Sequence, residues 1–206
     1  MARKSKTAYD DDSGVDRRDF FGQLLREIAR PVAEFREAVK DPPAESGPPE
    51  PLEKRLRPPG ALHETLFTDV CDRSGECVEA CPANAILSGA DGTPYVDPHH
   101  QPCVVCVGLD CMSACASGAL MPRAADALGM GLARVDSTAC LRSTGEDCTR
   151  CIQVCPLHEL GHTVLDLTLD GSLHVYEDAC VGCGCCVRAC PTQPKAINVE
   201  PARLLA

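Results

Sequence analysis

The most constraining feature of this 206-residue sequence is the spacing of its last four cysteines. They follow the pattern C-x2-C-x2-C-x3-C-P, at Cys180, Cys183, Cys186 and Cys190. Thiolates two residues apart can surround one face of an iron–sulfur cube, and the longer step carries the fourth thiolate to a neighbouring cluster. Gly182 and Gly184 allow backbone N–H groups to approach such a cluster and stabilise its negative charge. The run therefore predicts an iron–sulfur ligand set.

Three further cysteine sets repeat this pattern with altered spacing. The first set has Ser74 where a second cysteine would stand, the second widens its middle gap to four residues, and the third begins eight residues before its next cysteine. The sets are Cys71, Cys77 and Cys81; Cys103, Cys106, Cys111 and Cys115; and Cys140, Cys148, Cys151 and Cys155. Four consecutive sets, three of them ending in Cys-Pro, favour iron–sulfur clusters over structural zinc.

The composition supports metal thiolates over disulfides. The chain has 16 cysteines, no tryptophan and 3% aromatic residues, so an ordinary hydrophobic core would be thin. A disulfide framework would favour a secreted protein, and the sequence shows no cleavable signal pattern of basic start, apolar run and small-residue cleavage site. We therefore expect metal centres to hold this fold together.

The negative charge lies entirely in the cysteine-rich part. Residues 1–60 carry 12 basic and 12 acidic side chains, whereas residues 61–206 carry 8 and 18. This balance argues against nucleic-acid binding, which depends on lysine and arginine. It suits docking on a basic patch of a partner protein, although an acidic surface also simply favours solubility.

The chain divides into a tail and a cysteine-rich body. We expect residues 1–16 to be disordered and residues 17–40 to form an amphipathic helix, kinked at Pro31. Residues 41–60 hold 7 of the 17 prolines, which predicts an extended linker. No stretch is long and apolar enough for a transmembrane segment.

Short strands are expected between the cysteine sets. Asp91-Gly92 and Asp170-Gly171 are typical of two-residue hairpin turns. They predict pairing of residues 85–87 with 95–96, and of 164–169 with 173–176. Residues 132–135 and 197–199 are further strand candidates. Together with one-turn to two-turn helices near the Cys-Pro pairs, these strands predict an α+β fold.

Four segments carry a resemblance to a known family. CDRSGECVEACPANAI, GTPYVDPHHQPCVVCVGLDCMSACASGAL, CLRSTGEDCTRCIQVCP and CVGCGCCVRACPTQPKAI resemble, over residues 65–199, the polyferredoxins that accompany periplasmic nitrate reductase and methylamine dehydrogenase. The resemblance implies two ferredoxin-like modules with four cubane clusters and an N-terminal helical tail. It further implies a nested arrangement, with an outer module of residues 61–98 plus 170–206 and an inner module of residues 99–169.

The nested arrangement implies which cysteines share a cluster. Cys71 and Cys77 would join Cys190, and Cys81 would join Cys180, Cys183 and Cys186. Cys155 would join Cys103, Cys106 and Cys111, and Cys115 would join Cys140, Cys148 and Cys151. Three [4Fe–4S] clusters are expected on full ligand sets, and a fourth at Cys71, Cys77 and Cys190.

Ser74 leaves the type of that fourth cluster open. The site could lose one iron and hold [3Fe–4S], take an oxygen ligand from Ser74 or Asp72, or stay empty, since these clusters prefer thiolate ligands. Cys185, the cysteine outside the pattern, is interpreted as a bystander thiol rather than a replacement ligand.

Two other motifs suggest different chemistry. His158, Glu159 and His162 form H-E-x-x-H, the pattern of zinc hydrolases, but Pro156 and Gly161 leave little room for the helix that it needs. Arg17-Arg18 is similar to a twin-arginine export signal, but charged residues follow where an apolar run should be. We expect a cytoplasmic location, peripheral to a membrane at most, with the periplasm as the alternative.

Taken together, the sequence predicts an electron carrier, or an electron-transfer subunit of a larger oxidoreductase, rather than an enzyme. Its clusters would pass single electrons between a donor and a redox partner, either a catalytic subunit or a quinone-linked membrane subunit. The alternatives are a zinc-dependent hydrolase using His158, Glu159 and His162, and a zinc-stabilised scaffold.

Overall fold

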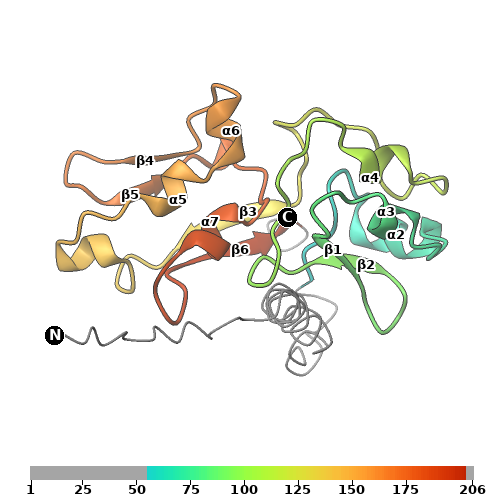
Figure 1. The fold of residues 1–206 in the computed structure, drawn as a ribbon, viewed down its shortest axis with the longest axis horizontal. Coiled ribbons are helices and arrows are strands. Elements are labelled where there is room, and N and C mark those ends of the chain that lie inside the picture. The colour runs from blue at the N-terminus through green and yellow to red at the C-terminus, as the bar shows by residue number, and fades with distance from the viewer. Residues whose placement is uncertain (1–54, 203–206) are drawn as a thin grey trace, which may run out of the picture. The chain divides into compact units, whose positions relative to one another are not determined.

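The computed structural model describes residues 55–202, which form short helices and strands around two hairpins (Figure 1). The N-terminal half (residues 55–121) contains α2 (Glu64–Val70), α3 (Glu76–Glu79), β1 (Ile86–Ser88), β2 (Pro94–Val96) and α4 (Asp110–Ser113). The C-terminal half (residues 130–202) contains β3 (Gly131–Val135), η2 (Leu141–Thr144), α5 (Arg150–Gln153), α6 (Pro156–Glu159), β4 (Leu165–Leu167), β5 (Leu173–Val175), η3 (Glu177–Ala179), α7 (Cys185–Ala189) and β6 (Ile197–Pro201). Among these residues, no helix has the length and hydrophobicity required to cross a bilayer.

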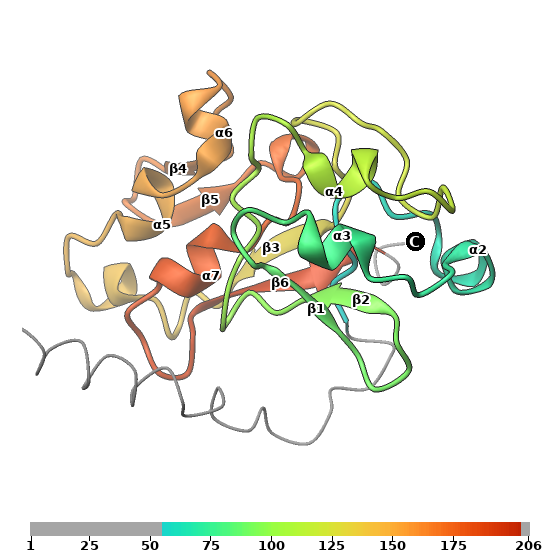
Figure 2. The ribbon, with the colours of Figure 1, turned by 45° about the vertical axis from the view of Figure 1, so that its right-hand side comes forward.

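The two halves repeat one plan, which Figure 2 shows from a second side. Each has a central antiparallel hairpin, β1–β2 or β4–β5, and an antiparallel pairing that joins its beginning to its end. In the C-terminal half this outer pairing is the β3–β6 sheet, which runs from Gly131↔Pro201 to Val135↔Ile197. In the N-terminal half it is the single bridge Ala61↔Leu120. The α+β fold is confirmed, and its two halves follow one another along the chain.

The predicted strands are confirmed within one or two residues at their ends, and the turns differ in type. In both hairpins a hydrogen bond closes a four-residue turn, from Gly92 N to Gly89 O (2.8 Å) and from Gly171 N to Thr168 O (2.8 Å). The aspartate lies inside the turn, and the glycine that follows it takes a positive φ. The Asp-Gly pairs therefore belong to longer turns that end in a left-handed residue, a common hairpin class.

The prediction that the extended linker reaches residue 60 is wrong, because residues 55–60 are buried in the N-terminal half. Leu56 is 3% exposed and forms a bridge with Val96. Arg57 binds both carboxylate oxygens of Glu64 (2.6 and 3.0 Å), donates to Thr93 Oγ1 (2.8 Å) and lies over the ring of Phe67. These contacts offset the free-energy cost of burying the charged guanidinium group of Arg57. The other predicted tail segments, residues 1–16, 17–40 and 41–54, lie outside the described residues.

Cysteine thiols supply a large part of the core of residues 55–202. Aliphatic side chains fill the rest, and Phe67 is fully buried. Half of the chain's cysteines are buried, namely Cys71, Cys77, Cys103, Cys111, Cys155, Cys183, Cys186 and Cys190. The stability of a core so rich in thiols is expected to depend on the metal that the thiols bind.

Candidate metal centres

The loops of the first, second and fourth cysteine sets share one backbone conformation. In each loop, the residue two places after the first cysteine has a positive φ, and so does the residue before the short helix. These residues are Arg73 and Gly75, Val105 and Leu109, and Gly182 and Gly184. Val105, a β-branched residue at φ 50°, adopts this conformation at a cost of about 1–3 kcal/mol. Strain of this kind is typical of a site whose loop geometry is fixed for a ligand.

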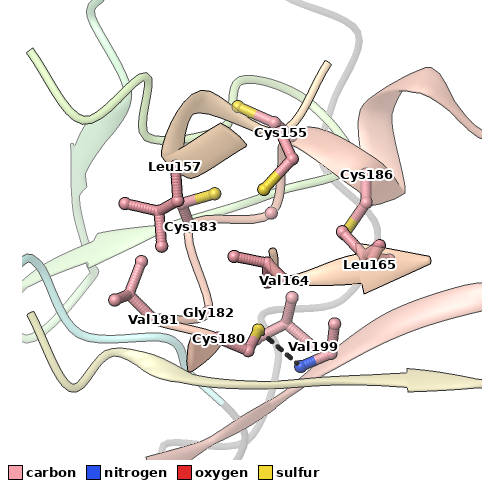
Figure 3. Close-up of a pocket in the computed structure, with 13 residues that line it drawn as sticks. Cys155, Leu157, Val164, Leu165, Cys180, Val181, Gly182, Cys183, Cys186 and Val199 are labelled. Atoms are coloured by element: carbon pink, nitrogen blue, oxygen red, sulfur yellow. Dashed lines mark hydrogen bonds between the residues drawn. The ribbon is translucent and has the colours of Figure 1, made fainter. Parts of the chain in front are cut away.

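One thiol site of the C-terminal half, which we call site 4, is formed by Cys155, Cys180, Cys183 and Cys186. Figure 3 shows these side chains around one pocket, with Leu157, Val164 and Leu165 in its walls. The backbone N–H of Ala133, on β3, donates to Cys180 Sγ (3.4 Å). Three of the thiols come from the fourth cysteine set, and Cys155 comes from the third.

Two further cavities each combine three thiols of one set with the last thiol of its neighbour. The cavity of site 2 is lined by Cys81, Cys103, Cys106 and Cys111. The cavity of site 3 is lined by Cys140, Cys148, Cys151 and Cys190. In both, apolar side chains such as Ile86 and Ile197 complete the walls. Each of these sites thus presents a four-sulfur donor set.

Site 1 brings together the three remaining thiols of the pattern: Cys71, Cys77 and Cys115. Helices α3 and α4 pack against each other. Burial, followed by the nearby charges of Cys115 and Cys71, raises the pKa of the Cys77 thiol to about 11. Ser74 is exposed and lies in the loop at the place that Cys183 occupies in the fourth set. Because the residues on both sides of it share the backbone conformation of the fourth loop, Ser74 occupies a ligand position without a thiol.

The nested pairing that the resemblance implied is therefore wrong. Cys81 lies with the second set rather than with Cys180, and Cys155 lies with the fourth set rather than with Cys103. The reason is local: each hairpin, β1–β2 and β4–β5, folds the chain back between a Cys-Pro pair and the next cysteine set. Joining sequence neighbours closes a much shorter loop than joining the first set to the fourth. The predicted module boundaries at residues 98 and 169 also cut across this grouping.

Several of the thiols lie in an environment that opposes free thiolates. Burial raises the pKa of Cys103 and of Cys111 to about 12 and that of Cys151 to about 11. Without metal these thiols stay protonated at neutral pH, so iron binding must release their protons. Backbone N–H groups also point at sulfur, as in Ala85 N to Cys81 Sγ (3.3 Å) and Leu120 N to Cys115 Sγ (3.3 Å). An all-thiol donor set with such hydrogen bonds fits an iron–sulfur cluster.

Comparison with known proteins agrees with this donor set. The model of the 4Fe-4S binding domain matches residues 173–194, which contain the fourth cysteine set. The ferredoxin-type protein NapG of Escherichia coli is 38% identical over 166 residues, which cover 73% of this chain and 72% of that protein. The methylamine utilization ferredoxin-type protein MauM of Methylophilus methylotrophus is 34% identical, over 92% of this chain and 88% of that protein. The chain belongs to this family of ferredoxin-type proteins. It is an iron–sulfur protein of electron transport.

The structure does not support the two zinc alternatives, a zinc-dependent hydrolase and a zinc-stabilised scaffold. His158 Nε2 accepts hydrogen bonds from the backbone N–H groups of Val164 (3.1 Å) and Leu165 (3.2 Å). The helix α6 has one turn, and His162 is exposed beyond its end. Within residues 55–202, no group of three or more histidine, cysteine, aspartate or glutamate side chains is arranged to hold a single metal ion. The first histidine of the motif therefore serves the turn that leads into β4.

Sixteen free cysteines are present, all within the described range, and no two of them form a disulfide. Cys185 is half-buried at the start of α7 and lines the pocket of site 4. Its thiol donates to the backbone carbonyl of Cys103 (3.4 Å). It therefore lies away from the thiols of site 1, and its hydrogen bond is a feature that spacing could not reveal.

Replacing His158 tests its structural role. His158→Ala leaves the N–H groups of Val164 and Leu165, both on buried residues, without their acceptor, so we expect a loss of about 1–3 kcal/mol in the free energy of unfolding. Anaerobic thermal unfolding of the iron-loaded protein measures the loss. His162→Ala is the matched control and should leave stability unchanged. Equal effects of the two variants, or zinc binding lost in both, would contradict this role.

Proposed function

We propose that this ferredoxin-type protein passes single electrons along up to four clusters of the [4Fe–4S] type, between a donor and a protein redox partner. The observation that carries the proposal is that each full thiol set is completed by the last cysteine of the neighbouring motif. Bound clusters supply the one-electron chemistry. The chain's residues hold the iron, exclude water with apolar walls and direct N–H groups at sulfur.

The proposed ligands follow the four sites. Site 2 uses Cys81, Cys103, Cys106 and Cys111; site 3 uses Cys140, Cys148, Cys151 and Cys190; and site 4 uses Cys155, Cys180, Cys183 and Cys186. Site 1 uses Cys71, Cys77 and Cys115. This assignment keeps every ligand that the sequence predicts and changes only which cysteines share a cluster.

We propose that site 1 holds a [3Fe–4S] cluster. Ser74 stands at the ligand position of a loop that otherwise has the backbone of the fourth set. Thiolate is the preferred ligand of cluster iron, so the corner facing a serine hydroxyl is the one that iron leaves most readily. Asp72 is fully exposed and its Oδ1 accepts a hydrogen bond from Ser74 N (3.1 Å), so its carboxylate is already engaged in the turn.

The protein is proposed to act as a carrier or as a non-catalytic subunit of a larger oxidoreductase. A redox protein with clusters at several places along its chain needs one partner that delivers electrons and one that takes them. A catalytic subunit or a quinone-linked membrane subunit would fill these roles. The cytoplasmic location expected from the sequence has no support in the comparisons, and the Arg17-Arg18 pair behind the periplasmic alternative lies outside the described residues; both locations stay predictions.

Thiol protection tests the proposed ligand partners. In Cys81→Ala, site 2 loses one ligand, so we expect Cys103, Cys106 and Cys111 to become reactive toward an alkylating reagent under anaerobic conditions. Peptide mass spectrometry locates the labels. The cysteines of the fourth set should stay protected, because site 4 keeps all its ligands.

Cys190→Ala is the matched control, since it removes the corresponding cysteine of the fourth set. It should expose Cys140, Cys148 and Cys151 and leave the second set protected. Labelling of the fourth set in Cys81→Ala would contradict this assignment and support the nested pairing instead. Full labelling of the wild-type chain after iron and sulfide reconstitution would overturn the proposed function itself.

Restoring the missing thiol tests the cluster type of site 1. Oxidised wild-type protein should show the EPR signal of a three-iron cluster, and Ser74→Cys should lose this signal and gain about one iron per chain. Ser88→Cys, which adds a thiol to an exposed position on β1, should keep the wild-type signal. A wild-type chain without the three-iron signal, and with the iron content of Ser74→Cys, would show that an oxygen ligand completes the cube.

A further inference from the structure

The ligand loops of sites 2 and 4 touch each other, although they belong to different halves of the chain. The backbone N–H of Cys103 donates to the carbonyl oxygen of Cys183 (3.0 Å). The thiol of Cys185 donates back to the carbonyl oxygen of Cys103 (3.4 Å). Two opposed hydrogen bonds thus connect a ligand residue of site 2 directly to the loop that surrounds site 4.

The contact is tight and largely shielded from water. Cys103 and Cys183 are 9% and 8% exposed. A Cβ atom added to Gly184 would lie 2.5 Å from Cβ of Pro98, so no side chain fits between the two segments. The residue at position 184 must also accept a φ of 87°, which favours glycine. The loops are therefore held in direct contact.

Cys185 differs from its counterparts in the other three sets. The residue directly before the third ligand position of the pattern is Glu76 in the first set, Asp110 in the second and Arg150 in the third. All three carry a charge and are exposed, as expected for the first residue of a short surface helix. In the fourth set this position is half-buried against the other half of the chain. A charged side chain would bury its charge there without a partner, whereas a thiol is apolar enough to enter and can still donate a hydrogen bond.

We propose that electrons cross between the two halves at the Cys103–Cys183 contact, and that Cys185 is the positioning residue that holds the two ligand loops together. The proposal rests on the proposed function, because it requires clusters in sites 2 and 4. One electron moves in each crossing: the cluster on one side is oxidised as the other is reduced, and no bond or proton changes place. The resulting order of the sites is 1, 2, 4 and 3, with the serine-containing site at one end.

The test compares Cys185→Ala, which removes the donor, with Cys185→Ser, which keeps one. In Cys185→Ala the Cys103 amide should exchange its hydrogen about fivefold faster, as expected for the loss of one hydrogen bond. In the fully reduced protein, the EPR splitting that two neighbouring reduced clusters cause in each other should shrink. Cys185→Ser should restore both values, and Arg188→Ala, on the exposed face of the same helix, should change neither.

Iron and sulfide content, measured on each variant, separates this proposal from the proposed function. Wild-type protein without iron–sulfur clusters would overturn the proposed function. Clusters present in full, with wild-type splitting in Cys185→Ala, would overturn the crossing at this contact alone. Faster exchange without a change in splitting would overturn the crossing as well, because the hydrogen bond would then support the fold and not the electron path.

Discussion

The fold depends on the burial of thiols that can remain in an apolar core only as neutral groups or as metal ligands. Burial raises the pKa of Cys103 and Cys111 to about 12, so neighbouring thiolates cannot form there unless positive iron compensates them. Around these thiols the helices have one or two turns and the strands three to five residues. Such elements contribute little stability by themselves. Metal binding and folding are therefore expected to be coupled in this chain.

The same constraint explains why the structure consists of two similar halves. A Cys-Pro pair directs the last cysteine of a set away from its own loop, and the hairpin that follows returns the chain to it. The β1–β2 and β4–β5 hairpins do this twice with the same turn geometry. Each half groups its own thiols around its own sites. Among the hydrogen bonds of residues 55–202, only those of Cys103, Cys183 and Cys185 join cysteine loops of the two halves.

The sequence predicted the strands and the cysteines that line the thiol sites, but not how those cysteines are grouped. The spacing of the cysteines predicts them as ligands, because a cluster-binding loop is a local pattern in the chain. The Asp-Gly pairs at residues 91–92 and 170–171 also predicted the two hairpins, each of which lies between sets that prove to be partners. Spacing alone does not fix the pairing, and the nested pairing came from the resemblance. Burial of Arg57 and the hydrogen bond of Cys185 depend on contacts between distant segments, which spacing alone does not reveal.

The measurement that tests this account most directly is the iron and acid-labile sulfide content of protein purified without oxygen. Three four-iron clusters and one three-iron cluster predict about 15 iron and about 16 sulfide per chain. A chain with zinc bound to its thiols, and with neither iron nor sulfide, would contradict the account at its foundation.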